Sequence, residues 1–507
     1  MPALKDHLLR SSQARQGAPG HMLEAKRAIR VLLIQPPTAH GVASLLPHVD
    51  NEGENEGIGH KPPLGLLYVA TTVKERSNHQ VMVIDAQAET LTFEQVVARA
   101  VDFRPDVIGL SVWTDFWYPC WHQAELLKKA LPQAHLTMGG PHLGIYPKET
   151  LDQPFVDSVV AGDGEIPFLY LCNMIANGVE DNSMQGLHFK KGGVKDGDGT
   201  LYIHGDLDEL PIPDRTLLPI GHYGSVMAKG AFVTTMITSR GCPHRCTFCK
   251  LSFQKNLARS AGSVIEEFRR IKALGIGEVE IYDDTFTWSK KRLEEICNGL
   301  IEADLGVEWA ARDRVSSAAI DLDTLKLMRK AGCTRIHYGV ESGVQRVIDR
   351  MKKRITLDQA RKAVDLAKKA KITVLTYFMF GNLDETIEDM QATIDFALTL
   401  NADFAQFSVT IPYAGTEMYE EALTSGLIDG DYWGDYAHHP VPDFLPPKLI
   451  ESHADKATLL TLRNEAVRRF YFRPRFIIKE LLSLRSFKEF KRKAGMGLQL
   501  LHSVYRR

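Results

Sequence analysis

Residues 238–250 read TSRGCPHRCTFCK and hold three of the chain's seven cysteines, Cys242, Cys246 and Cys249. The spacing C-x₃-C-x₂-C places all three thiols on one short loop. The loop follows the apolar, β-branched run FVTTMITS, which predicts a buried strand. Thiolates are ligands for soft metals and for iron–sulfur clusters. We therefore expect the three thiols to bind a metal centre at the carboxyl end of a strand.

Three thiolates leave a four-ligand site incomplete, and there are two ways to complete it. His244 could be the fourth ligand of a structural Cys₃His zinc site. Alternatively, the thiolates hold three irons of a [4Fe–4S] cluster and leave the fourth iron open. Structural zinc normally joins two separated groups of ligands, whereas here the thiols share one loop and His244 is close in sequence to Cys242. The spacing favours the cluster.

The cysteine stretch lies near the start of a series of strand-and-helix repeats that runs over residues 229–440. The expected strands are FVTTMITS, GEVEIYDD, VEWAARD, TRIHYGV, ITVLTYFMF and DFAQFSVTI, each followed by a helical stretch. Their spacing of about 30 residues is that of a βα unit. Six such units predict a partial, TIM-like (βα)₆ barrel, in which active groups cluster at the carboxyl ends of the strands.

Five short apolar runs precede this series: RVLLIQPP, QVMVIDA, DVIGLSVW, HLTMGG and DSVVAGDGE. Helical stretches lie between them, which predicts an α/β fold with an N-terminal doubly wound, Rossmann-like parallel sheet over residues 29–180. Ligands of such sheets bind at the carboxyl ends of the strands. Those ends carry Gly, Ser and Asp in this chain.

Three further segments complete the organisation: a mobile tail (1–28), a connector (181–228) and a helical, basic C-terminal extension (441–507). The extension is rich in Phe, Tyr and Leu. Two interpretations of it stay open. It is either a helical cap packed on the barrel, or a basic amphipathic surface helix that meets a membrane or a lipid-like substrate.

The bulk composition limits the class of protein. A chain of 507 residues predicts two domains plus extensions, and a formal net charge of −2 argues against a large nucleic-acid partner. No apolar run approaches the roughly 20 residues that span a bilayer, and the N-terminus has no apolar signal region. We expect a cytoplasmic protein, or one peripheral to the inner face of the membrane through the extension. The remaining cysteines are expected to be buried thiols: Cys120, Cys172, Cys297 and Cys333.

The stretch GCPHRCTFC resembles the cluster loop of the radical S-adenosylmethionine (SAM) superfamily. The resemblance implies that Cys242, Cys246 and Cys249 hold a [4Fe–4S] cluster whose open iron chelates the amino and carboxylate groups of SAM. An electron from the cluster then cleaves SAM to methionine and a 5′-deoxyadenosyl radical, which abstracts hydrogen from an unactivated carbon. A low-potential donor such as ferredoxin or flavodoxin must supply that electron.

The same resemblance implies SAM contacts beyond the cysteines. Phe248 would lie beside the adenine, the pair Asp283 and Asp284 would receive the amino group, and the remaining contacts would come from Arg312, Glu341 and Ser342. The ordinary alternatives are loop packing for Phe248, helix capping or solvation for the aspartates, and an exposed ion pair for Arg312, placed just after the third strand. The loops GNLDET and IPYAGT resemble later pocket loops of the family, with Leu383 and Ala414 at positions where the family has proline.

The first domain resembles that of cobalamin-dependent radical SAM enzymes, through KPPLGLLYVA, IDAQAETLT, GLSVW, GGPHLGIYP and AGDGEIPF. The resemblance spans about residues 29–475. It implies that the cobalamin tail lies against Ser111, Gly139, Gly140, Gly162 and Gly164, although ordinary tight turns would also explain the glycines. The Asp-x-His-x-x-Gly motif that supplies a lower cobalt ligand in many cobalamin domains does not occur in this chain. His40 lies in the corresponding loop, where a solvated histidine is the favoured interpretation.

Three functions follow from these features. The first is a cobalamin-dependent radical SAM methyltransferase that methylates an unactivated carbon of a small or lipid-like substrate, using SAM, the cluster and methylcobalamin. The second keeps these cofactors but catalyses cyclisation, ring rearrangement or oxygen insertion, as in the anaerobic cyclase of chlorophyll synthesis. The third is a cobalamin- or metal-binding sensor without turnover.

Overall fold

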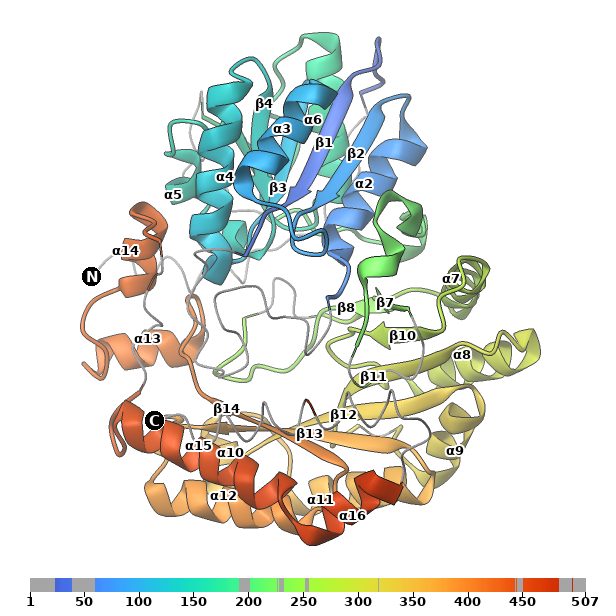
Figure 1. Cartoon of the computed structure of the whole chain (residues 1–507), viewed down its shortest axis with the longest axis vertical. Helices are drawn as coiled ribbons and strands as arrows, with labels where there is room; N and C mark the ends of the chain where they lie inside the picture. Colours follow the sequence, from blue (N-terminus) through green and yellow to red (C-terminus); the bar gives the residue numbers. More distant parts are fainter. Residues whose placement is uncertain are drawn as a thin grey trace.

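The computed structural model describes residues 23–38, 60–190, 201–225, 232–250, 255–317, 319–442 and 450–482, with Met227, Phe444 and Gly495. Two α/β units are stacked, with the N-terminal unit at the top of Figure 1 and the second sheet below it. The predicted α/β fold is confirmed.

The first unit is built on a six-stranded sheet with the order β2-β1-β3-β4-β5-β6. The first five strands in chain order are parallel. Their bounds are β1 (Arg30–Gln35), β2 (Gln80–Asp85), β3 (Val107–Ser111), β4 (His135–Gly139) and β5 (Ser158–Val160). The chain runs outward from β1 to β2 and then returns to β3, so the topology reverses between β1 and β3. Ligands of doubly wound sheets bind at such a switch point.

Helices cover both faces of this sheet, as a doubly wound fold requires. Two of them, α2 (Leu64–Arg76) and α6 (Glu165–Asn177), contact each other on one face, and α3 (Phe93–Phe103) and α4 (Trp117–Ala130) contact each other on the opposite face. The central strands are unbroken Val, Ile and Leu runs buried on both sides. Helix α3 begins at a capping box made by Thr92 and Gln95.

The structure corrects two of the expected boundaries. The connector belongs in part to the first unit, because β6 (Leu187–Phe189) pairs antiparallel with β5 and Tyr202 forms a bridge with Gly162. The end of the supposed mobile tail is fastened to α6, since Asn173 donates to the carbonyl of Leu23 at 2.6 Å. Sequence patterns missed both features because a three-residue strand and a single hydrogen bond leave no periodicity.

The second unit is an open sheet of six parallel strands in the order β14-β13-β12-β11-β10-β7. Every predicted strand is present: β7 (Val233–Met236), β10 (Glu278–Ile281), β11 (Glu308–Arg314), β12 (Cys333–Glu341), β13 (Thr373–Phe380) and β14 (Phe404–Val409). The helices that cover one face are α7 (Ala261–Ala273), α8 (Lys290–Ala303), α9 (Leu322–Lys330), α11 (Leu357–Lys369) and α12 (Ile387–Thr399). The other, concave face points toward the first unit (Figure 1).

The start of the C-terminal extension closes one edge of this sheet. The hydroxyl of Tyr471, at the end of α15 (Lys456–Tyr471), accepts from the amide of Ala405 at 3.2 Å and donates to its carbonyl at 2.7 Å. Leu459 and Phe470 of the same helix are buried in the core of the second unit. Helix α15 is therefore the predicted cap, and it satisfies backbone groups of the edge strand β14.

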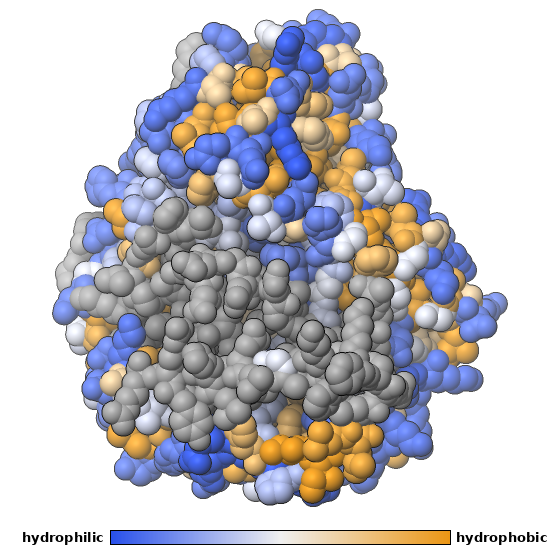
Figure 2. Space-filling model, viewed as in Figure 1, coloured by the Kyte–Doolittle hydropathy of each residue, from blue (hydrophilic) through white to orange (hydrophobic). Residues whose placement is uncertain are grey.

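Helix α16 (Pro474–Leu482) differs from α15, because four apolar side chains stay exposed on it: Ile477, Ile478, Leu481 and Leu482. Apolar residues gather at the lower edge of Figure 2, where Figure 1 places this helix. No helix among the described residues is long and apolar enough to cross a membrane.

The two units share one core. Helices α13 (Glu417–Thr424) and α14 (Tyr432–His438) follow the last strand of the second sheet and pack against the first unit. The indole of Trp117 donates to the carbonyl of Ala437 at 3.1 Å, and the amide of Tyr118 donates to the hydroxyl of Tyr436 at 2.9 Å. The placement of one unit against the other is therefore fixed by packed side chains.

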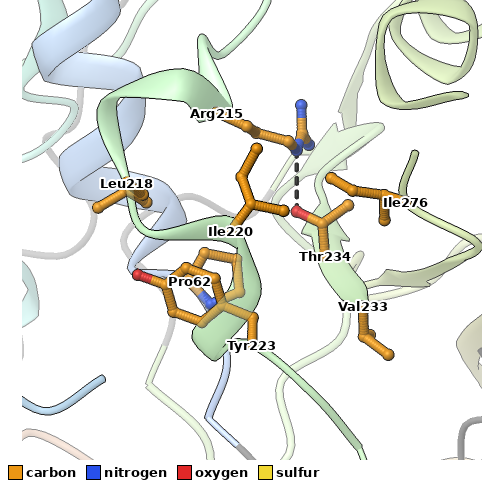
Figure 3. Close-up of a pocket in the computed structure, with 8 residues that line it drawn as sticks. All are labelled: Pro62, Arg215, Leu218, Ile220, Tyr223, Val233, Thr234 and Ile276. Carbon is orange, nitrogen blue, oxygen red and sulfur yellow. Dashed lines mark hydrogen bonds between the residues drawn. The ribbon is translucent and has the colours of Figure 1, made fainter. Parts of the chain in front are cut away.

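A small, largely apolar pocket lies between the connector and the start of β7 (Figure 3). Arg215 donates from Nε to the hydroxyl of Thr234 at 2.8 Å beside it. Val233 and Thr234 begin β7, so the pocket is at the end of the strand opposite to the cysteine loop. It is a packing defect of the junction and not the candidate active site.

Candidate functional site

The cysteine loop follows β7 and is held in place by backbone hydrogen bonds at its centre. The amide of Thr247 donates to the carbonyl of Met351 at 3.0 Å, and the amide of Met418 donates to the carbonyl of Thr247 at 2.8 Å. The loop is flanked by a two-stranded ribbon, β8 (Ser239–Arg240) and β9 (Leu257–Ala258). It therefore lies at the carboxyl ends of the second sheet, as predicted.

The environment of the three thiols fits a cationic centre. Cys242 is buried, Cys246 half-buried and Cys249 exposed. Partial shielding of the Cys249 sulfur from water, and then the charges of Cys246, Asp284 and Cys242, raise the pKa of Cys249 to about 12. Bound cations reverse such a shift and deprotonate a coordinating thiol outright. Among the described residues, no three or more His, Cys, Asp or Glu side chains are grouped closely enough to hold a metal ion. The fit therefore rests on three soft ligands that share one loop.

Arg314 and His244 are the basic side chains nearest to the question of which metal centre the thiols hold. The Nη1 atom of Arg314 donates to Cys246 Sγ at 3.7 Å, which places a positive charge beside a sulfur. Burial and the charges of Arg314, Arg354 and Lys353 lower the pKa of His244 to about 4, and its ring meets the edge of Trp288. A neutral imidazole is the form that binds zinc, so the preference for the cluster rests on the spacing of the thiols and not on this pKa.

The two adjacent carboxylates after β10 have different roles. Asp283 is 2% exposed and accepts from the amide of Thr238 at 2.6 Å and from the hydroxyl of Ser239 at 2.8 Å. Asp284 is exposed and accepts from the amide of Gly241 at 3.0 Å. Burial raises the pKa of Asp283, and partial shielding from water together with the charge of Asp283 raises the pKa of Asp284. Asp283 thus holds the start of the cysteine loop, and Asp284 is the carboxylate open to a ligand.

The other predicted SAM contacts are spread over the same end of the sheet. Arg312 lies inside β11 and not after it, with its guanidinium 3.9 Å from the centre of the Tyr282 ring. Glu341 ends β12 at a φ of 72° and pairs with Lys353 at 2.6 Å. Ser342 is fully buried and hydrogen-bonds Thr393 at 3.1 Å. Phe248 is half-buried and packs against the core that the two units share.

Contacts with the protein backbone require glycine at two of the positions predicted for the cobalamin site. Gly140 has a φ of +106°, and a Cβ there would lie 2.7 Å from the carbonyl oxygen of Val112. Gly162 has a φ of +96°, and a Cβ would lie 2.2 Å from the carbonyl oxygen of Tyr202. Both positions therefore need glycine for the fold, and their contact with cobalamin stays a prediction.

The remaining cobalamin-site predictions lie at strand ends of the first sheet. Ser111 ends β3 and Gly139 ends β4, beside the switch point. Gly164 precedes α6, and a Cβ there would meet Val69 at 3.2 Å. His40 lies outside the described residues.

An ion-pair cluster that the sequence analysis missed joins the two units. Arg240, two residues before Cys242, pairs with Asp163 at 3.0 Å and with Glu165 at 2.5 Å. Its guanidinium also lies 5.1 Å from the centre of the Tyr68 ring. These charges belong to the motifs AGDGE and SRGC, which are far apart in the sequence. Only the structure shows that they are in contact.

Comparison with known proteins agrees with this architecture. Residues 59–171 match the B12 binding domain, and residues 236–397 match the radical SAM superfamily. The chain is 33% identical over 466 residues to the uncharacterized methyltransferase PH0819 of Pyrococcus horikoshii, covering 91% of this chain and 96% of that protein. It is 27% identical to the anaerobic magnesium-protoporphyrin IX monomethyl ester cyclase of Rubrivivax gelatinosus, covering 89% and 78% of the two chains.

A solved structure shows the same fold. The cobalamin-dependent SAM radical enzyme OxsB, with aqua-cobalamin and SAM bound, superposes with a TM-score of 0.66 at 19% identity, over 94% of this chain and 72% of OxsB. The two matched domains imply a [4Fe–4S] cluster, SAM and cobalamin as cofactors. The cysteine loop, the domain order and the close relative together show that this chain belongs to the cobalamin-dependent radical SAM enzymes.

Proposed function

We propose that the protein is a C-methyltransferase that acts on an unactivated carbon of a small-molecule substrate. One observation carries the proposal: the cysteine loop at the end of β7 and the strand ends of the cobalamin-type sheet are joined directly through Arg240 and the Asp163–Glu165 loop. Two cofactors held at these places would face each other across a fixed gap. The likeness to a methyltransferase over nearly the whole chain supports the same reaction.

The cofactors supply a radical that removes hydrogen from carbon and a carrier that delivers a methyl group. The protein's own part is binding and orientation. Cys242, Cys246 and Cys249 would hold the cluster, and Asp284 would accept hydrogen bonds from the amino group of SAM. Asp283 fixes the backbone before Cys242, and Arg314 places a positive charge beside Cys246. Orientation of this kind brings reacting groups into line before the chemistry begins.

A cyclase, ring-rearranging or oxygen-inserting reaction is the second candidate, because the chain is also similar to a cyclase over most of its length. The product distinguishes the two, since each methylation adds about 14 Da to the substrate and cyclisation does not. A sensor without turnover is the third candidate, and it would bind the cofactors without cleaving SAM.

The first test is SAM cleavage. The enzyme is purified anaerobically, reconstituted with iron, sulfide and cobalamin, and incubated with SAM and dithionite while 5′-deoxyadenosine is measured. We expect deoxyadenosine from the wild type and from Cys297→Ala, a core cysteine on α8, and none from the variant with Cys242, Cys246 and Cys249 changed to Ala. A zinc-loaded protein, or a loaded cluster that gives no deoxyadenosine with any reductant and candidate substrate, would refute the radical assignment.

We also propose two partners. A low-potential ferredoxin or flavodoxin would reduce the cluster. An anionic membrane surface would meet α16, whose exposed residues Ile478 and Leu481 lie in a basic segment. Sedimentation with phosphatidylglycerol vesicles tests the second partner: Ile478→Glu with Leu481→Glu should abolish binding, while Val101→Glu, an exposed apolar site on α3, should not.

A further inference from the structure

A chain of polar side chains on the concave face of the second sheet leaves one hydroxyl hydrogen for a ligand. Arg335 donates from Nε to His337 Nε2 at 3.0 Å, and His337 Nδ1 lies 2.8 Å from the hydroxyl of Tyr377. Burial and the charges of Arg335 and Arg312 lower the pKa of His337 to about 3, so the ring is neutral. Because Nε2 accepts, the ring proton is on Nδ1 and is donated to Tyr377. The hydrogen of the Tyr377 hydroxyl has no acceptor among the described residues.

The charges below Tyr377 are balanced within the protein. Glu280 pairs with both Lys61 and Arg335 at 3.1 Å, and Arg335 also pairs with Glu278 at 3.0 Å. Tyr282 adds a hydrogen bond to the second oxygen of Glu280 at 3.1 Å. Two cations and two carboxylates therefore neutralise one another, and none of the four charges is left over for a ligand.

Arg312 is an uncompensated cation of this face, as is Arg314 beside Cys246. Arg312 is exposed and has no carboxylate partner among the described side chains. Its guanidinium lies over the face of Tyr282, an arrangement that leaves the N–H edge of the fork open. Arg312 is opposite His337 in the register of the two strands, and its charge acts on Tyr377. Arg312 and the hydroxyl hydrogen of Tyr377 thus offer hydrogen-bond donors on the same face of the sheet, on the two strands that flank β12.

We propose that Arg312 and Tyr377 form the site that recognises a carboxylate or phosphate group of the substrate, which makes the substrate a small acid and not a neutral lipid. This inference rests on the proposed function. A paired donor of this kind matches an oxyanion. Arg314, two residues nearer the strand end, reaches Cys246, and the Cα atom of Arg312 lies about 6–7 Å further back along the same strand. Because Arg314 is the arginine beside the cysteine loop, we assign the exposed Arg312 to the substrate in place of the SAM carboxylate.

The test measures anion binding to the reconstituted holoenzyme. Methylphosphonate and malonate are titrated separately at constant ionic strength, by ³¹P line broadening and by calorimetry. We expect at least one of them to bind one site, about tenfold or more weakly in Arg312→Gln and about threefold more weakly in Tyr377→Phe, with Arg312→Lys between wild type and Arg312→Gln. Arg361→Gln is the matched control, because its guanidinium also lies over an aromatic ring, 4.5 Å from the centre of Phe396, but on α11.

The outcomes separate the sources of the anion and the two hypotheses. Tighter methylphosphonate binding assigns a phosphate-bearing substrate, and tighter malonate binding a carboxylate. Equal affinities in wild type and Arg312→Gln would overturn the inference, as would displacement of the anion by SAM, which would return Arg312 to the SAM carboxylate. Deoxyadenosine formation tests the proposed function separately. A failure of anion binding therefore does not imply a failure of the radical reaction, or the reverse.

Discussion

Replacing Arg240 with Gln should uncouple the two units of the molecule. In the wild type its guanidinium lies between Asp163 and Glu165, whose side chains are 20% and 4% exposed. Removal of the cation leaves two carboxylates in a largely buried place. Breaking a buried ion pair from one side costs about 3–5 kcal/mol. Since Asp163 keeps some contact with water, we expect a loss near the lower end, about 3 kcal/mol.

A double-mutant cycle isolates the pair itself. Glu165→Gln leaves Arg240 paired with Asp163, and the double variant removes one of the two uncompensated carboxylates. The double variant should therefore be more stable than the sum of the single losses predicts, by about 1–2 kcal/mol. The free energy of unfolding is measured by urea titration of the apo protein, followed by tryptophan fluorescence.

The same pair predicts a pH dependence. Burial alone would raise the pKa of Glu165, but the charge of Arg240 and its hydrogen bond outweigh burial and lower it. A lowered pKa means that the stabilisation is present above pH 4.5 and is lost as the pH falls below it. Arg240→Gln should remove this acid-sensitive part. Arg99→Gln, which breaks an exposed pair with Glu89, is the control and should cost about 0–1 kcal/mol. A loss below 1 kcal/mol in Arg240→Gln, or strictly additive losses, would refute the reasoning.

Three further predictions use the same urea assay. Gly162→Ala should lower the free energy of unfolding by about 2 kcal/mol or more, because its Cβ would meet a backbone oxygen and its φ is positive. Gly139→Ala, whose Cβ would have its nearest contact at 3.7 Å, should lower it by under about 1 kcal/mol, and equal losses would contradict this account. Burial raises the pKa of Glu385 to about 7, so the free energy of unfolding should fall by about 3 kcal/mol as the pH rises from 4.5 to 7 and the carboxyl loses its proton. The same pH profile in Glu385→Gln as in the wild type would exclude this. Tyr471→Phe should cost about 1–2 kcal/mol by leaving Ala405 unpaired at the sheet edge, and no loss would show that water replaces the hydroxyl.

The sequence was sufficient for the elements whose signal is local. The first sheet's strands are largely apolar runs, and those of the second recur about every 30 residues ahead of helical stretches, so all six strands of the second sheet and five of the first could be located. The cysteine loop was equally local, because its three thiols lie within eight residues. The sixth strand of the first sheet has three residues and no alternation, which is too short for a periodic pattern.

The roles of single side chains were harder to predict, because they depend on partners far away in the chain. Asp283 and Asp284 look equivalent in sequence, yet Thr238 and Ser239 use the first and leave the second open. Glu341, for which contact with SAM stays a prediction, pairs with Lys353, and no pattern of helix or strand in the sequence indicates this pair. Burial and hydrogen bonding decide which carboxylate is free, and neither is a property of the local sequence.

The same limit applies to the coupling between the two units. Each unit has its reactive loop at the carboxyl ends of its own parallel strands, a rule that sequence alone supplies. That rule does not say that the two ends face each other. Arg240 makes them do so, since it links the residues before Cys242 to the loop after β5. Helices α13 and α14 add a packed contact to the first unit from the far end of the second sheet. Because the second unit is attached through both its first strand and its last, rotation of one reactive loop against the other would have to break a charged contact and an apolar one together.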